Sequence, residues 1–301
     1  MIVLVAGATG ALGREIVRRL RGRGHTVRAL VRSTSAPERV ARLQQMGATI
    51  VQGDLKDRAS LIAACRGAEA VVSTVSATLT AQAGDSFAAT DRAGTMQLID
   101  EALVAGARHF VFVSFDTSLF PESPLTTAKR EVEDHLKKSG LTYSILHPSL
   151  FMESWLGPML FGDPATATAK VYGEGNQRLR YVAVSDVAEL AVQALTTPAA
   201  RDATIPFGGP EELSQRDAVQ IFEKVYGKPF AVTEVSEPEL EAQWRSAEDP
   251  FQKSFAALLL GVARGLDSGV QPPFESFPMK MVSVKDFVRG IARPGRPRAA
   301  S

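Results

Sequence analysis

Three glycines recur at a spacing of three near the start of the chain, in the segment VLVAGATGALGR that covers residues 3–14. Gly7, Gly10 and Gly13 follow a short apolar run and precede a helix-like stretch. A strand, a glycine turn and a helix start together let backbone N–H groups and the positive end of the helix approach a phosphate. The spacing therefore predicts a loop for the diphosphate of a dinucleotide, with these contacts: Gly7, Thr9, Gly10, Ala11, Leu12 and Gly13.

The end of the second apolar run, in RALVRSTS, indicates which dinucleotide to expect. Sites for NAD usually place an acidic residue here, on the ribose hydroxyls. This chain instead has Arg32 at that position, and no acidic residue follows until Glu38. An arginine makes charge-assisted hydrogen bonds to a 2′-phosphate. The expected cofactor is therefore NADPH, and a solvated surface arginine is the alternative interpretation of Arg32.

Two further strand ends carry residues that we expect to contact the same cofactor. GDLKD follows the third apolar run, and STVSA ends the fourth. Ligands of doubly wound sheets bind beyond the carboxyl ends of the strands. The expected contacts are Asp54 and Leu55 beside the adenine, and Thr74, Val75 and Ser76 along the ribose and diphosphate. Simple turn chemistry is the alternative for each of them.

The elements that must position these residues alternate regularly through the first half of the chain. Apolar, β-branched-rich runs cover 2–6, 26–31, 48–51, 70–75, 109–114 and 142–146, and helix-like stretches cover 11–22, 37–46, 59–66, 87–105 and 126–139. Strands that are apolar on both faces and separated by amphipathic helices predict a parallel sheet with helices on both sides. The expected fold class is α/β, a doubly wound parallel sheet of the Rossmann type.

The regular alternation ends near residue 148, and Pro and Gly become more frequent. We expect residues 1–148 to form an NAD(P)-binding Rossmann domain. Residues 149–292 are expected to form a smaller, mixed C-terminal lobe that covers the substrate and can return strands to the sheet. The Pro/Arg-rich tail at 293–301 is expected to be disordered.

Helix signals within the second part are weaker but specific. One helix is expected at 185–197 with Ser185 as its N-cap, and another after Ser214, which could cap it. A third helix is expected to cover 237–263.

The composition is that of an ordinary globular chain and argues against several classes of function. Its 301 residues are 45% hydrophobic and carry a formal net charge of +1, so no basic field predicts nucleic-acid binding. No apolar run approaches the roughly 18 residues of a membrane span, and the run at 2–6 is too short for a signal peptide. We therefore expect a cytoplasmic protein without membrane contact. The single cysteine and four scattered histidines predict no disulfide and no metal site.

Longer segments add to the glycine turn: VAGATGALG, ALVR, GDL, HFVFVS, AKREVEDHLKKSGLTYSILHPSLFMES, YVAVSDVAELAVQAL and FGGPEELSQRDAVQIFEKVYGK. Together they run through most of the chain, and they resemble the NmrA-like family of atypical short-chain dehydrogenases/reductases. A more distant resemblance is to isoflavone-reductase-like enzymes. The resemblance implies either an NADP-preferring reductase or a redox-sensing regulator that binds the cofactor without turnover.

One departure from ordinary short-chain dehydrogenases concerns their Tyr-x-x-x-Lys pair, in which the tyrosine transfers the proton. The residues four positions after the four tyrosines are His147, Asn176, Ser185 and Phe230. The lysine in the matching place is Lys129, and Leu125 stands four residues before it. The missing tyrosine argues against alcohol–ketone chemistry and nucleotide-sugar epimerisation. What remains is compatible with hydride delivery to a small, flat, apolar acceptor, such as a quinone or conjugated carbonyl, that needs little help with its proton. The missing tyrosine also adds weight to a protein that binds the cofactor without turnover.

The resemblance gives Lys129 a cofactor and catalytic role, because a lysine there would hold the nicotinamide ribose and stabilise developing negative charge. From spacing alone, the alternative is an i,i+4 ion pair between Lys129 and Glu133 on a charged helix face. Ser114 ends the fifth strand, where the family's relatives keep a serine near substrate. A cap of the following turn is an equal alternative for Ser114.

The segment HPSLFMESW follows the sixth strand. The resemblance implies that His147 and Pro148 cross the nicotinamide. Phe151, Met152 and Trp155 are expected to form an apolar substrate wall for a flat ring. Core packing is the alternative for each wall residue. A structural role is the alternative for His147, which could also donate a proton.

Two functions are carried forward from the sequence. The first is an NADPH-dependent oxidoreductase, a monomer or homodimer, that acts on a small-molecule substrate. The second is an NADPH-binding redox sensor that reports to a protein partner. A nucleotide-sugar isomerase or lyase is disfavoured by the missing tyrosine.

Overall fold

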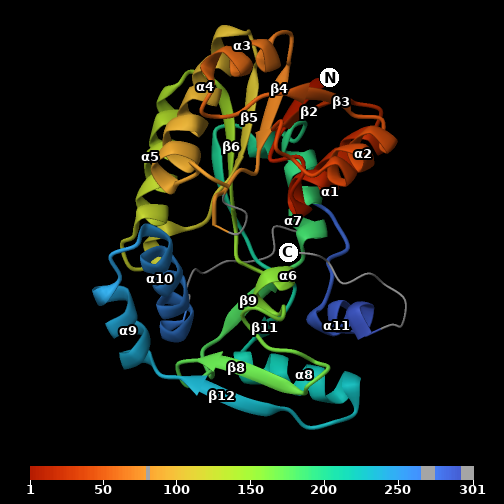
Figure 1. The fold of residues 1–301 in the computed structure, drawn as a ribbon. Coiled ribbons are helices and arrows are strands. Elements are labelled where there is room, and N and C mark those ends of the chain that lie inside the picture. Colours follow the sequence, from red (N-terminus) through yellow and green to blue (C-terminus); the bar gives the residue numbers. More distant parts are fainter. Residues whose placement is uncertain (79–81, 266–274, 293–301) are drawn as a thin grey trace.

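The computed structural model describes residues 1–78, 82–265 and 275–292. The expected disorder of 293–301 lies outside these described residues. Among the described residues, a central parallel sheet carries helices on both faces, and a smaller lobe with two short sheets lies at one end of it (Figure 1). The α/β Rossmann prediction is confirmed.

The central sheet has the strand order β10-β6-β5-β4-β1-β2-β3, and every neighbouring pair in it is parallel. Its strands are β1 (Ile2–Ala6), β2 (Thr26–Val31), β3 (Thr49–Gln52), β4 (Ala70–Ser73), β5 (His109–Val113), β6 (Thr142–Pro148) and β10 (Ala203–Phe207). The order reverses between β1 and β4, and ligands of such sheets bind beyond this reversal. The first six strands agree closely with the predicted apolar runs.

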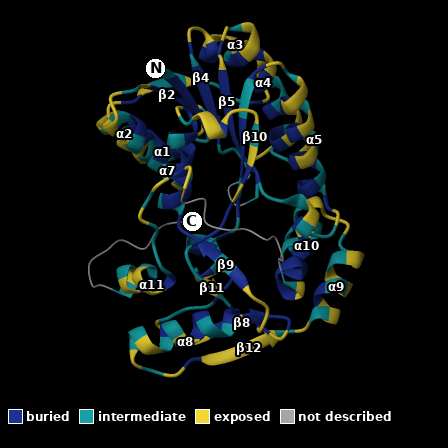
Figure 2. Cartoon of the chain, turned by 180° about the vertical axis from the view of Figure 1, so that it is seen from behind, coloured by how far each residue is buried: buried dark blue, intermediate teal, exposed yellow. Residues whose placement is uncertain are grey.

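Successive side chains of β1 point to opposite faces of the sheet, and they show why both faces need to be covered by helices. Val3 and Val5 belong to one buried cluster, whereas Leu4 and Ala6 belong to another on the opposite face. The first face is covered by α1 (Ala11–Gly22), α2 (Pro37–Gln45) and α7 (Val184–Ala194). The second is covered by α3 (Arg58–Cys65), α4 (Thr95–Val104) and α5 (Pro124–Lys138). The π-helix η1 (Phe87–Gly94) leads into α4 and packs against α5. Buried strands between more exposed helix surfaces are visible in Figure 2.

Two of these helices differ from the predicted ones at their starts. The stretch predicted as one helix over 87–105 begins as a π-helix and continues as α4. α5 begins at Pro124, two residues before the predicted start, because Ser123 caps it: its hydroxyl accepts the Thr126 N–H at 3.3 Å.

The smaller lobe follows β6 and is irregular, as predicted. Its elements are β7 (Leu150–Phe151), α6 (Met152–Trp155), β8 (Thr168–Tyr172), β9 (Leu179–Val182), β11 (Glu212–Leu213), α8 (Gln215–Tyr226), β12 (Ala231–Val235), α9 (Glu237–Ser246), α10 (Pro250–Arg264) and α11 (Val284–Ala292). They form the sheets β11-β9-β7 and β12-β8. Between them, residues 184–207 return to the central sheet as α7, the short turn η3 (Pro198–Ala200) and β10.

Two helix predictions in this region are wrong. Ser185 does not cap α7; the helix begins at Val184, whose N–H donates to both carboxylate oxygens of Glu153 at 3.0 Å. The single helix predicted over 237–263 is two helices, because Pro250 has no N–H and begins a new helix that Asp249 caps. The predicted cap Ser214 is confirmed by its hydroxyl, which accepts the Asp217 N–H at 3.0 Å.

None of the described helices combines the length and the apolarity that crossing a bilayer requires. In the same described ranges, no three His, Cys, Asp or Glu side chains are grouped closely enough to hold a metal ion.

Candidate cofactor and substrate pocket

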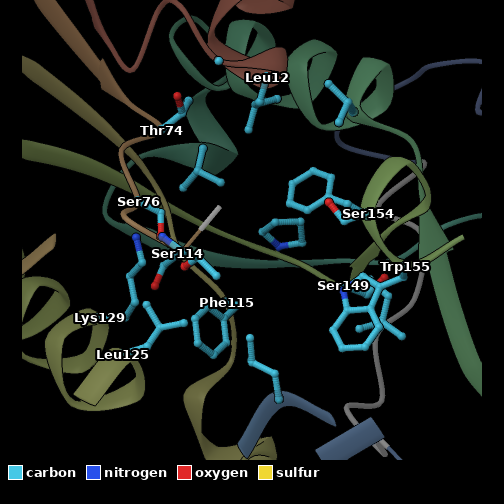
Figure 3. Close-up of a pocket in the computed structure, with 18 of the residues that line it drawn as sticks. Leu12, Thr74, Ser76, Ser114, Phe115, Leu125, Lys129, Ser149, Ser154 and Trp155 are labelled. Atoms are coloured by element: carbon cyan, nitrogen blue, oxygen red, sulfur yellow. Dashed lines mark hydrogen bonds between the residues drawn. The ribbon is translucent and has the colours of Figure 1, made fainter. Parts of the chain in front are cut away.

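A pocket of about 830 Å³ opens at the carboxyl ends of the central strands, between the sheet and the smaller lobe. The expected cofactor residues all line it: Gly7, Thr9, Gly10, Ala11, Leu12, Gly13, Arg32, Asp54, Leu55, Thr74, Val75, Ser76, Lys129, His147 and Pro148. Figure 3 shows Leu12 and Thr74 at one edge of this pocket, Lys129 and Ser114 along one side, and Trp155 opposite them. The pocket has the position that ligands of doubly wound sheets occupy.

The glycine turn leaves the start of α1 open. Gly7 has a φ of 79°, and a Cβ at Gly13 would lie 2.2 Å from the Gly7 carbonyl oxygen, so both positions require glycine. Gly10 is the N-cap of α1, and no side chain of the described residues makes a capping hydrogen bond to the start of this helix. The first turn of α1 also contains no acidic residue. The first N–H groups of the helix are therefore available to an anion, and the helix dipole favours one.

Arg32, Asp54 and Asp85 line one end of the pocket, and Lys56 pairs with both aspartates there; these four residues are called the arginine end. Arg32 Nη1 donates to Asp85 Oδ2 at 2.6 Å, and the Lys56 ammonium donates to the other carboxylate oxygen. Burial raises the pKa of Asp85, but hydrogen bonds from Lys56, the Gln82 N–H and Arg32 outweigh it and hold that pKa well below its ordinary value. Arg32 thus already holds an anionic partner that the sequence did not reveal.

The other end, the lysine end, is built around Lys129 of α5. Lys129 is 4% exposed, its Nζ donates to the Val75 carbonyl at 3.1 Å, and it lies 5.1 Å from the centre of the Phe112 ring. Asp91 of η1 is fully buried, with Oδ1 3.4 Å from Lys129 Nζ and Oδ2 accepting the Ala77 N–H at 2.9 Å. The alternative Lys129–Glu133 pair is not formed, because the two side chains turn to different partners.

Glu133 lies behind the lysine end and joins two residues that line the pocket. Its Oε1 accepts the Ser114 hydroxyl at 2.6 Å and the His147 Nε2–H at 2.8 Å. Burial raises the pKa of Glu133, but hydrogen bonding and charge from His147, with further contributions from Ser114 and Lys137, leave that pKa below its ordinary value. Ser114 is therefore anchored to a carboxylate; the turn after it is capped by Asp116 instead.

The apolar wall only partly follows the prediction. Phe151 and Trp155 line the pocket, but Met152 does not, because it is fully buried in the core of the smaller lobe. Met152 is therefore a core residue, as the alternative interpretation held. Further apolar residues of the lining include Phe115, Phe120, Leu125, Leu160, Phe255 and Leu258.

Three acidic residues of this site were missed by sequence reasoning: Asp85, Asp91 and Glu133. The helical periodicity of the sequence could have identified Glu133. It lies on the buried face of α5, which is otherwise an apolar stripe formed by Leu125, Ala128, Val132 and Leu136. A charged residue on a buried helix face needs a partner, which makes it a candidate site residue. Asp85 and Asp91 lie in a loop and a π-helix, where no such periodicity marks them.

Comparison with known proteins extends these observations. The curated relatives include the photosystem II assembly factor Ycf39 of Synechocystis, which is 31% identical over 92% of this chain and 85% of its own length. They also include the (4-alkanoyl-5-oxo-2,5-dihydrofuran-3-yl)methyl phosphate reductase of Streptomyces griseus, 32% identical over 78% of this chain and 77% of its own.

Solved structures share the fold at lower sequence identity. A quinone oxidoreductase of Escherichia coli, described as NADPH-dependent and solved with NADPH, superposes with a TM-score of 0.76 at 20% identity, covering 97% of this chain and 99% of its own. The sequence model of the NmrA-like family matches residues 1–259. The chain belongs to the NmrA-like family.

Proposed function

We propose that the chain is an NADPH-dependent oxidoreductase that delivers hydride to a small, flat, apolar acceptor such as a quinone or a conjugated carbonyl. The observation that carries this proposal is one continuous pocket. It joins an uncapped helix start behind a glycine turn to a buried lysine and an apolar wall. The first feature suits a diphosphate, and the other two suit a reacting ring.

The residues present suit the diphosphate, the 2′-phosphate and the nicotinamide ribose of NADPH. The Gly7 turn and the N–H groups at the start of α1 would hold the diphosphate. Arg32 would hold the 2′-phosphate by exchanging its Asp85 partner for the phosphate. Lys129 would hold the nicotinamide ribose, and the segment at His147 would pass beside the ring. When bound, NADPH supplies the hydride.

Lys129 is placed to stabilise negative charge that develops on an acceptor. Its contacts with Asp91 and the Val75 carbonyl fix the ammonium in a position that water hardly reaches. A preorganised cation of this kind acts more strongly than one in water, because little reorganisation is needed as charge develops. Phe151 and Trp155 offer ring faces against which a flat acceptor can pack.

Two relatives support this choice of acceptor. The Streptomyces griseus relative is named as a reductase of an oxo-dihydrofuran compound, and the Escherichia coli structure is named as a quinone oxidoreductase. The missing Tyr-x-x-x-Lys pair agrees with acceptors whose reduced oxygen is stabilised by delocalisation.

A second candidate is a protein that binds NADPH without turning it over. It is favoured by the 31% identical relative, whose name is that of an assembly factor rather than an enzyme. Both candidates use the same glycine turn and Arg32, so they differ only in what happens at Lys129.

Turnover and binding measured side by side separate the two candidates. NADPH oxidation is followed by nicotinamide absorbance with a panel of quinones and enones, and NADPH affinity is followed by calorimetry. We expect Lys129→Ala to lower kcat about 100-fold or more, the range for losing a preorganised charge donor. Exposed Lys138 of the same helix provides the matched control, Lys138→Ala. Binding without turnover across the panel in the parent would contradict the oxidoreductase and favour the second candidate.

A further inference from the structure

Ser114 and His147 stand side by side at the lysine end because β5 and β6 pair in register. Val113 is paired with Leu146, and the Ser114 N–H donates to the Leu146 carbonyl at 2.9 Å. The next residue of each strand therefore emerges at the same edge of the sheet, and both line the pocket. Their closeness is a consequence of the sheet and does not depend on a loop.

Glu133 reaches the same pair from behind, from the buried face of α5. Ser114 and Glu133 are 5% and 7% exposed, and Glu133 is not among the residues that line the pocket. Because an ionised carboxylate can only accept hydrogen bonds, Ser114 and His147 must both donate to it. The nearest cation on the same helix, Lys137, has its Nζ 3.7 Å from the other oxygen of Glu133.

The hydrogen bond to Glu133 determines which of the two ring nitrogens of His147 is engaged by the protein. Nε2 carries the hydrogen that Glu133 accepts at 2.8 Å. Because His147 lines the pocket, Nδ1 is the ring nitrogen that would meet a ligand there. Charge on the imidazole is compensated by the Glu133 carboxylate. A histidine backed by a buried carboxylate in this way can hold a proton at Nδ1 and pass it on.

We propose that His147 is the proton donor of the reduction and that Glu133 and Ser114 are its positioning residues. The proposal rests on the proposed oxidoreductase function. NADPH would supply a hydride, whose electron pair becomes the new C–H bond on a conjugated carbonyl, and the displaced π electron pair of the acceptor would shift onto the carbonyl oxygen. The Nδ1–H bond of His147 breaks as that oxygen gains the proton. The acceptor is reduced by two electrons, NADPH is oxidised to NADP⁺, and His147 recovers its proton from water.

Lys129 and His147 thereby have separate tasks. The ammonium of Lys129 remains engaged by Asp91 and the Val75 carbonyl, which suits it to stabilise charge rather than to give up a proton. His147 supplies the proton that the tyrosine supplies in ordinary short-chain dehydrogenases. The lack of Tyr-x-x-x-Lys then does not leave the site without an acid.

The test compares two acceptors that differ in their need for a proton. An enone yields a strongly basic enolate, whereas a tetrahalogenated quinone yields a weakly basic oxyanion that leaves the site unprotonated. His147→Gln keeps a donor near Glu133 but cannot transfer a proton. We expect kcat with the enone to fall about 100-fold or more, as for loss of a general acid. The quinone should lose less than about threefold.

A matched control exists on the outer face of α5. His135 Nε2 lies 2.7 Å from Asp100 Oδ1, so it is also a histidine paired with a carboxylate, but it does not line the pocket. His135→Gln should leave both acceptors unchanged. Equal losses on the two acceptors in His147→Gln, or no loss on either, would overturn the proton-donor role while leaving the oxidoreductase intact. Absence of turnover in the parent would overturn both.

A second measurement needs neither cofactor nor turnover. Side-chain ¹⁵N NMR of the cofactor-free chain resolves the ring nitrogens of four histidines, and His147→Gln identifies the His147 signals. We expect the neutral ring to carry its hydrogen on Nε2, and this preference to weaken in Glu133→Gln. A neutral His147 protonated on Nδ1 instead would overturn the arrangement, whatever the kinetics show.

Discussion

The arginine end and the lysine end of the pocket use the same kinds of side chain in opposite surroundings. At the arginine end, Asp85 is buried, but its cationic partners Arg32 and Lys56 are 27% and 31% exposed. At the lysine end, the side chains of the partners Lys129 and Asp91 are only 5% and 0% exposed. At the arginine end, water can replace an ion-pair partner of Arg32 or Lys56. At the lysine end, Lys129 and Asp91 are shielded from water and depend on each other for charge compensation.

This difference explains how one pocket can both bind and react. Exposed charges exchange partners at low cost, which suits a site that must take up and release a phosphate. Buried charges keep their positions and act through a low local dielectric, which suits charge stabilisation at a reacting atom. The first set of residues is therefore expected to control affinity, and the second to control stability and rate.

The largest expected effect is on stability, at the lysine end. Asp91→Asn leaves Lys129 buried without a countercharge, so we expect the free energy of unfolding to fall by about 3–5 kcal/mol. Asp85→Asn at the arginine end should cost about 1 kcal/mol or less, because Arg32 and Lys56 can turn to water. Urea unfolding measures both variants. Similar losses at the two ends would break the distinction between them.

An intermediate effect is expected on cofactor affinity, at the arginine end. Arg32→Ala should weaken NADPH binding by about 1–3 kcal/mol, the range for losing a hydrogen bond to a charged group, and should spare NADH. Arg42→Ala, an exposed arginine of α2, controls for the general loss of positive charge. Calorimetric titration with each nucleotide provides the measurement. An equal loss for NADPH and NADH would refute contact with the 2′-phosphate.

The smallest expected effect is the pH dependence that Glu133 adds at the lysine end. Its pKa is lower in the folded chain than its ordinary value of 4.5, so its stabilising contribution is complete above about pH 4.5. That contribution is lost as the pH falls through the lower, folded-state pKa. In Glu133→Gln, the free energy of unfolding should therefore fall less steeply as the pH is lowered from 7 to 3, at roughly one-unit steps, and urea unfolding measures it. An unchanged acid limb would show that Ser114 and His147 do not stabilise the carboxylate.

The sequence was sufficient for the sheet and for the open helix start, because these depend on local signals. Apolar runs marked the strands, and the Gly7 turn needs only neighbouring residues to form. Local signals could not predict the ion-pair partners of Arg32 and Lys129. Asp85 follows Arg32 by 53 residues, and Asp91 reaches Lys129 from another helix, so only the packing of the elements brings them together.

Local signals also misled where two interpretations fitted the same pattern. The i,i+4 spacing of Lys129 and Glu133 offered an ion pair as the alternative interpretation, but Lys129 bonds to the Val75 carbonyl, whereas Glu133 bonds to Ser114 and His147. Met152 and Trp155 lie close in sequence, yet one packs into the core of the smaller lobe and the other lines the pocket. Which side of a short helix faces a cavity depends on its neighbours rather than on its own sequence.

The position of β10 has a consequence for the chain as it is being made. β10 supplies the partner of β6 through the pairs from Ala203–Ser144 to Phe207–Pro148, about 60 residues after β6 has been synthesised. Until then, β6 is an open edge with unpaired N–H and C=O groups, which invites pairing with other chains. A fragment ending at residue 148 would keep that edge permanently. Aggregation of nascent or truncated chains should therefore begin at β6 and cease once residue 207 has left the ribosome.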